Sequence, residues 1–132
     1  DSIRPYQHVL EPLSAYMQIA FSQYGDYSLG GSYNVGPHEK DCIQTRTLVD
    51  LFVKCWGEGL KWESRSDGGP HEAGLLKLDC SLLKNKLGWQ PVWDIETAVQ
   101  KTVEWSKCWL AGKDAALCME KQIKEYFKEV RR

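Results

Sequence analysis

Apolar residues recur at three- and four-residue intervals in several stretches of the chain, and this spacing predicts helices. The first helix covers residues 11–24 and ends at Gly25, a residue that disfavours helix continuation. Its apolar face consists of Leu13, Tyr16, Met17, Ala20 and Tyr24. A second helix begins after Thr45 or Thr47 as its N-cap and ends at Gly57. Its apolar positions are Leu48, Leu51, Phe52 and Cys55.

The C-terminal half predicts three further helices, which cover residues 81–87, 95–111 and about 117–127. Ser81 is the expected cap of the first of these, and Gly88 follows it as the left-handed residue that closes a helix. Asp94 is the expected cap of the second and clearest helix, and Gly112 ends it. Five helices are therefore expected in all.

Short segments rich in β-branched or alternating residues, bounded by Gly or Pro, predict strands at residues 30–37, 60–63 and 75–79. These strands are too few for a full sheet, and the sequence has no internal repeat. A length of 132 residues allows one domain with a modest core. The chain is therefore expected to form a single domain over residues 1–132, helix-rich and of the α/β class, with a few short strands.

The charge balance changes little in this picture, because 17 basic residues face 18 acidic ones and no basic stripe precedes the C-terminal end. Nucleic acid is an unexpected partner for such a chain. No apolar run approaches the ~20 residues that a bilayer-spanning helix needs. Residues 1–4 lack the leader pattern of a secretory precursor, and we therefore expect a fragment of a larger protein.

Cysteine spacing argues against a metal site or a disulfide framework. The five cysteines are widely separated and form no Cys-x-x-Cys pair with a suitable His; they are Cys42, Cys55, Cys80, Cys108 and Cys118. Cys55 and Cys108 lie in amphipathic runs, where a free Cys commonly acts as a small buried hydrophobe. The cysteines indicate a reducing, cytoplasmic setting.

Two features of a dinucleotide-dependent oxidoreductase are missing from the sequence. A dinucleotide is received by a Gly-rich turn between a strand and a helix. The glycine pairs at 57/59 and 68/69 do not open such a helix. None of the tyrosines has a Lys four positions later, so the chain is expected to bind no cofactor and to carry no catalytic residue of its own.

Three motifs nevertheless resemble one family of such enzymes. The segments are residues 4–14 (RPYQHVLEPLS), 70–73 (PHEA) and 87–91 (LGWQP). They resemble the C-terminal, sugar-nucleotide-binding part of an extended short-chain dehydrogenase/reductase, and within that superfamily the family of CDP-glucose 4,6-dehydratases. The resemblance implies a lyase that uses NAD held by an N-terminal Rossmann domain, largely absent here, to form CDP-4-keto-6-deoxyglucose for deoxysugar biosynthesis such as that of O-antigen.

The resemblance also implies which residues meet the substrate. Arg4 is expected to pair with the nucleotide diphosphate, for which its guanidinium fork is suited. His71 is expected to contact the pyrophosphate, and Glu72 to orient a neighbouring group. Either Gln44 or Thr45 stands at the start of the second helix, where a nucleotide group can bind. His8 and Asn34 are expected to be structural.

The implied partners are CDP-glucose or a related nucleotide sugar, the missing Rossmann domain, and further copies of the enzyme in a homo-oligomer. The isolated fragment is expected to be inactive. Two alternatives stay open: part of another nucleotide-sugar dehydratase or epimerase acting on GDP or UDP sugars, and a free-standing binding or interaction module without catalytic function.

Overall fold

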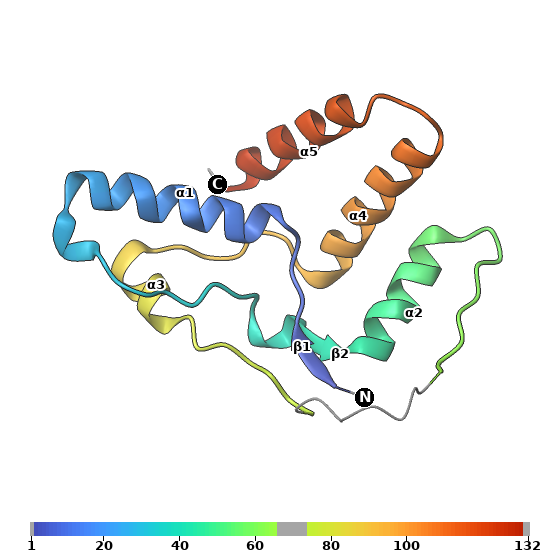
Figure 1. The fold of residues 1–132 in the computed structure, drawn as a ribbon, viewed down its shortest axis with the longest axis horizontal. Helices are drawn as coiled ribbons and strands as arrows, with labels where there is room; N and C mark the ends of the chain where they lie inside the picture. Colours follow the sequence, from blue (N-terminus) through green and yellow to red (C-terminus); the bar gives the residue numbers. More distant parts are fainter. Residues whose placement is uncertain (1, 66–73, 131–132) are drawn as a thin grey trace.

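The computed structural model describes residues 2–65 and 74–130, and helices make up most of this part (Figure 1). The helices are α1 (Leu10–Gly25), α2 (Thr45–Trp56), α3 (Ser81–Leu87), α4 (Ile95–Leu110) and α5 (Ala115–Val130). Two short 3-10 turns cover Tyr27–Leu29 and Glu39–Asp41. The expected five helices are all present, so the prediction of a helix-rich chain with few strands is confirmed.

The sheet is small and its strands are not the expected ones. Strand β1 (Ile3–Pro5) pairs antiparallel with β2 (Cys42–Gln44), with Arg4 opposite Ile43. On its other side β1 is bridged in parallel by Leu75: the Ile3 amide donates to the Gly74 carbonyl at 2.9 Å, and the Leu76 amide donates to the Ile3 carbonyl at 3.0 Å. The first described residues of the chain thus lie between two segments from far along the sequence.

The strands predicted at 30–37, 60–63 and 75–79 are wrong, apart from the single bridge at Leu75. Residues 30–37 are held by side chains rather than by a strand partner: the Asn34 amide donates to the Asp79 carbonyl at 3.0 Å, and Gln7 donates to the Val35 carbonyl at 3.3 Å. The first bond ties residues 30–37 to the segment before α3, although the Asn34 side chain is exposed. Local β-propensity cannot supply a pairing partner, and the three-residue strands that do form are too short to show a period.

Helix ends follow the expected capping chemistry with two corrections. The Asp94 carboxylate accepts from the Thr97 amide at 3.0 Å, and Gly88 has the left-handed φ of 67° that closes α3. Thr45 and Ser81 are each the first helical residue rather than the cap. The caps are the preceding residues, and the Asp79 carboxylate accepts from the Ser81 amide at 2.9 Å.

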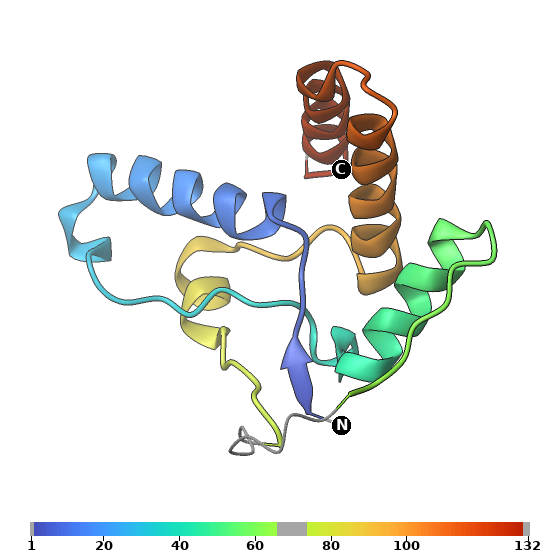
Figure 2. The same ribbon diagram turned by 45° about the vertical axis from the view of Figure 1, so that its right-hand side comes forward.

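Two apolar clusters form the core. One joins α1 and α3 through Ala15, Leu83 and the indole of Trp89, all nearly or fully buried. The other lies where α2 packs beside α4, an arrangement visible in Figures 1 and 2. Its buried residues are Ile95, Val99 and Val103 of α4, covered by half-buried side chains that include Tyr6 and Ile43.

A buried carboxylate links the N-terminal motif to the C-terminal helix. Glu11 is fully buried and accepts from the Val92 amide at 3.1 Å, the Trp93 amide at 2.7 Å and the Tyr126 hydroxyl at 2.7 Å. Tyr126 is also in hydrogen-bond contact with the Ser14 hydroxyl at 2.8 Å. Burial raises the pKa of Glu11 above its ordinary value despite these donors. The side chains of α1, α5 and the 92–93 segment therefore meet at one polar junction.

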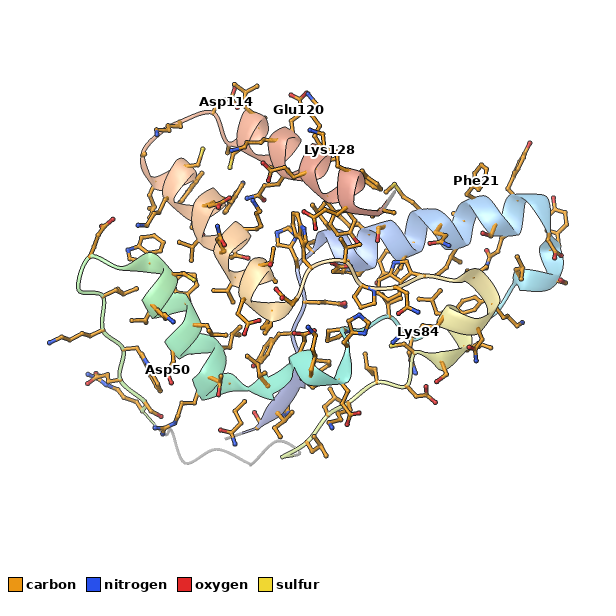
Figure 3. All side chains as sticks on the ribbon, turned by 180° about the vertical axis from the view of Figure 1, so that it is seen from behind. Phe21, Asp50, Lys84, Asp114, Glu120 and Lys128 are labelled. Atoms are coloured by element: carbon orange, nitrogen blue, oxygen red, sulfur yellow. The ribbon has the colours of Figure 1, made fainter. Side chains whose placement is uncertain are left out.

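The apolar face predicted for α1 points outward. Leu13, Tyr16, Met17, Ala20 and Tyr24 are all exposed. Figure 2 shows no described element over the upper side of this helix, and the labelled Phe21 side chain in Figure 3 points away from the molecule. The inward face is partly polar because its groups have partners in the core: besides Glu11, Gln18 donates to the Leu87 carbonyl at 2.5 Å.

Candidate functional site

Thr45 joins β1, β2 and the start of α2. Its hydroxyl lies 2.8 Å from the Tyr6 hydroxyl and donates to the Ser2 carbonyl at 3.2 Å, and its amide donates to the same carbonyl at 3.0 Å. These bonds fix the first turn of α2 against the N-terminal strand. Thr45 is half-buried, and its hydroxyl is committed to this junction rather than presented alone to solvent.

The N-terminus of α2 is unusually positive for a helix start. Its cap residue Gln44 makes no side-chain capping bond, and its first turn carries Arg46 and no acidic residue. A cation there opposes the helix dipole, which favours negative charge at this end. The amides and the guanidinium together favour an anionic group at this place.

Arg46 is held beside the aromatic ring of Trp62, with 5.7 Å between the guanidinium carbon and the ring centroid. Trp62 is itself fixed by its indole N–H, which donates to the Asp50 carboxylate at 2.9 Å. A hollow of about 130 Å³ opens here and is lined by Thr45, Arg46, Val49, Trp62 and Ser64. The site thus offers a positive edge, a hydroxyl and a flat aromatic wall.

Arg4 lies on the neighbouring strand. Its register partner is Ile43, one pair along the ladder from Ile3 and Gln44. Continuing the alternation by one more step pairs Ser2 with Thr45, so Arg4 and Thr45 belong to the same face of the two strands. One Arg4 nitrogen donates to the Ile3 carbonyl at 2.9 Å. The register therefore places two of the four expected substrate-binding residues on one side of the β1–β2 pair, while Arg4 is not among the residues that line the hollow beside Thr45.

The other two, His71 and Glu72, lie outside the described residues. The chain is described again from Gly74, whose carbonyl accepts from Ile3 of β1. The roles expected for His71 and Glu72 stay predictions. The segment that follows them reaches the strand that carries Arg4.

His8, in the same motif as Arg4, is structural as expected. Its imidazole is buried, accepts from the Leu10 amide at 3.2 Å and packs edge-on against Trp93 with 4.9 Å between ring centroids. Burial, with a smaller effect from Lys101, lowers the pKa of His8. The ring is thus neutral at neutral pH, which its role as acceptor requires.

A second and larger hollow of about 930 Å³ lies between α1 and the C-terminal end of α5. Part of its wall is the 87–91 motif, in which Gly88 ends a helix, Trp89 is buried and its indole N–H donates to the Ser14 hydroxyl at 3.1 Å. The contacts of Gly88 and Trp89 thus serve packing and helix termination. Among the remaining residues at the rim are Met17 and Phe21 of α1.

The described residues do not fit a dinucleotide. The glycines with positive φ that follow α2, Gly57 and Gly59, lead away from a helix rather than from a strand into one. In the part of the chain that is described, no three His, Cys, Asp or Glu side chains are arranged to hold a metal ion. Nor does any helix there combine the length and apolarity needed to cross a membrane.

The sequence patterns missed Arg46 and Trp62. Arg46 stands in the first turn of α2, but the sequence gives no sign that its guanidinium lies over the ring of Trp62. Trp62 was assigned to a strand, and its contact with α2 depends on tertiary packing. Cys55 was also expected to be buried, and it is exposed although it lies at helical spacing from Leu51 and Phe52, which pack against α4.

Comparison with known proteins agrees with the motifs. No protein-family model matches the chain. CDP-glucose 4,6-dehydratase of Salmonella typhimurium (strain LT2) is 39% identical over 128 residues, which cover 95% of this chain and 35% of that enzyme. The chain therefore spans about a third of the length of this relative, as expected for a C-terminal portion. Over that span, the chain is similar to CDP-glucose 4,6-dehydratase, which is consistent with a C-terminal fragment of such an enzyme.

Proposed function

We propose that this chain is the nucleotide-sugar-binding part of a CDP-glucose 4,6-dehydratase and that it recognises the diphosphate of CDP-glucose. The observation that carries the proposal is the junction of β1, β2 and α2, where Arg4 and Thr45 share a strand face beside a helix start that bears Arg46. Guanidinium groups and helix amides are the donors that phosphate oxygens prefer.

Catalysis belongs to another part of the enzyme in this proposal. The proton and hydride transfers need an NAD site and a catalytic Tyr–Lys pair, and the sequence of this chain contains neither pattern. The chain alone is therefore an inactive single domain of the larger protein. NAD, when bound by the complementary domain, would accept and return the hydride.

The exposed face of α1 is the proposed contact with that complementary domain. Monomeric proteins rarely leave a continuous apolar patch of this kind uncovered. On α1 the patch comprises Val9, Leu13, Tyr16, Met17, Phe21 and Tyr24, of which Phe21 and Tyr24 are 82% and 86% exposed. The relative's remaining two-thirds of sequence is ample to cover such a face.

Binding of CDP-glucose to this chain, followed by calorimetry or by NMR titration, tests the proposed recognition. Arg4→Ala and Arg46→Ala are each expected to weaken binding by about 1.5–3 kcal/mol, the scale of a hydrogen bond to a charged group. CDP should bind nearly as well as CDP-glucose, because the diphosphate carries the interaction. The same titration with GDP and UDP sugars tests the alternative that the chain belongs to an enzyme that acts on one of those nucleotide sugars.

The matched control is Arg65→Ala. Arg65 is an exposed Arg whose guanidinium pairs with Glu63 on the surface, and exposed pairs of this kind contribute little. Its removal should leave binding unchanged. Equal binding by the wild-type chain, Arg4→Ala and Arg46→Ala would refute the assignment of the site, and a keto-sugar product formed by this chain with added NAD would refute the division of labour.

A further inference from the structure

Two cysteines face each other across the turn between α4 and α5. Cys108 lies in the last turn of α4 and Cys118 in the first turn of α5. Both contact the same atom, the carbonyl oxygen of Asp114: the Cys108 thiol at 3.7 Å and the Cys118 amide at 3.3 Å. This shared acceptor places the Cys108 sulfur against the first turn of α5.

The turn that holds the two cysteines is itself well fixed. The Asp114 carboxylate accepts from the Ala116 amide at 2.9 Å and the Leu117 amide at 3.3 Å, so Asp114 acts as the start of α5. The Gly112 amide donates to the Trp109 carbonyl at 3.0 Å, which closes α4. Figure 3 shows Asp114 at the outer end of this helical hairpin, away from α1.

Both thiols are reduced and half-exposed, so a small oxidant can reach them. Burial raises the pKa of Cys118, and the proximity of the Cys108 thiol raises it further. The geometric evidence that the two residues are neighbours is their shared contact with the Asp114 carbonyl oxygen. The raised pKa means that Cys118 stays protonated, and slow to react, at neutral pH.

We propose that Cys108 and Cys118 are a modification site: a dithiol that a low-molecular-weight disulfide such as oxidised glutathione converts reversibly to an intramolecular disulfide joining α4 to α5. The proposal does not depend on the substrate assigned above. It differs from the sequence-based expectation, in which cysteine spacing argued against a disulfide framework and Cys108 was expected to be a small buried hydrophobe.

The exchange balances as two successive thiolate attacks. The Cys108 thiolate attacks one sulfur of oxidised glutathione, which breaks the glutathione disulfide and releases one glutathione thiolate. Cys118 then gives its proton to water and attacks the Cys108 sulfur, which releases the second glutathione. The protein loses two protons and two electrons: the electrons reduce the disulfide of oxidised glutathione to two thiolates, and these thiolates take up the two protons.

The bond would tighten the attachment of α5. That helix otherwise meets α4 through the Gln122 amide, which donates to the Lys101 carbonyl at 2.8 Å, and through the Lys101 ion pair with Glu125 at 2.8 Å. Its far end carries Tyr126, the partner of the buried Glu11. A crosslink near the start of α5 therefore restrains the helix that completes the polar junction.

The test incubates the chain with excess oxidised glutathione at about pH 8.5, which favours thiolates, and maps non-reduced peptides by mass spectrometry. The expected product is one crosslinked pair of peptides containing Cys108 and Cys118, lighter by two hydrogens, with loss of two of the five thiols. The thermal midpoint should rise by about 5–10 °C, as expected for closing a loop of this size. A reductant should reverse both changes.

Cys118→Ser keeps the Cys108 thiol and removes its partner, so it should stop at a glutathione adduct on Cys108 with no rise in the midpoint. Cys55→Ser, which removes an exposed cysteine elsewhere, should oxidise as the wild type does. The proposal is overturned if exhaustive oxidation yields separate glutathione adducts, or bonds between chains, without the Cys108–Cys118 peptide. A crosslinked protein with an unchanged midpoint would overturn the inferred effect on α5.

Discussion

At the residue scale, the Glu11 carboxylate accepts from two amides and one hydroxyl in the interior without a cation beside it among its hydrogen-bond partners. Glu11→Gln keeps the shape but turns an amide NH₂ toward a group that also donates. We expect this variant to lose about 1–3 kcal/mol of unfolding free energy, the cost of leaving a buried donor unsatisfied. Urea unfolding followed by tryptophan fluorescence measures it.

Tyr126→Phe is the matched partner, since it removes one donor and leaves the two amide bonds. Tyr126→Phe should lose less unfolding free energy than Glu11→Gln does. The two changes share an interaction, so the loss in the double variant should fall short of the sum of the single losses. Strict additivity would mean that the hydroxyl and the carboxylate act independently.

The wild-type chain and Glu11→Gln also test how the unfolding free energy depends on pH. Because the folded pKa of Glu11 lies above the unfolded value, its contribution to stability is fully present below the unfolded pKa and is lost as pH rises through the folded pKa. The unfolding free energy of the wild-type chain should therefore rise relative to that of Glu11→Gln as the pH is lowered from neutral to about 5. A difference that stays constant over this range would contradict the raised pKa.

The residues whose roles the sequence patterns identified correctly are those that act on residues close to them in the sequence. Gly88 and Asp94 act on their own helix ends, and their chemistry is readable from neighbours in the sequence. Glu11 was not singled out, because its partners lie 81 to 115 residues away. Arg4 and Thr45 were named through the family resemblance, and only the register of β1 and β2 shows that they share a face.

At the scale of elements, α4 receives two carboxylates at its start. Asp94 is the cap residue directly before α4, while the buried Asp41 at the end of a distant 3-10 turn accepts from the Ile95 amide at 3.1 Å. We expect Asp94→Ala to cost about 0.5–2 kcal/mol of unfolding free energy. Asp41→Ala should cost at least as much, because it also leaves a cavity and an unsatisfied buried amide.

Asp79→Ala is the control for these variants, since Asp79 is exposed and serves only the short helix α3. Thermal unfolding followed by circular dichroism ranks the three proteins. If Asp79→Ala proved the most destabilising of the three, the capping groups of α4 would contribute less to stability than that of α3, contrary to this prediction.

Helix α1 shows where prediction from the spacing of apolar residues fails. The helices were found because each is seven residues or longer and bounded by a cap or a glycine. The inward face of α1 was misassigned because hydrophobic spacing assumes that the richest apolar stripe faces the core of the same chain. That assumption fails for a helix whose apolar stripe packs against another domain or another chain.

At the scale of the whole molecule, the outward face of α1 predicts self-association of the isolated chain. Phe21→Glu should shift the sedimentation profile toward the monomer and reduce binding of a hydrophobic dye, because it places a charge in the middle of the patch. Leu117→Glu is the control, since Leu117 is 63% exposed on α5, outside the α1 patch. A wild-type chain that is monomeric at high concentration and binds no dye would contradict the prediction.

The position of Glu11 near one end of the chain and of Tyr126 near the other has a consequence for synthesis on the ribosome. While α1 emerges, the carboxylate can remain hydrated in the first turn of a helix, where negative charge is favoured. The amides of residues 92 and 93 follow Glu11 by 81 and 82 positions and the hydroxyl of Tyr126 follows it by 115 positions, so these donors become available only after those residues have been translated. The N-terminal motif thus reaches its final environment last, after translation of the residues that enclose it.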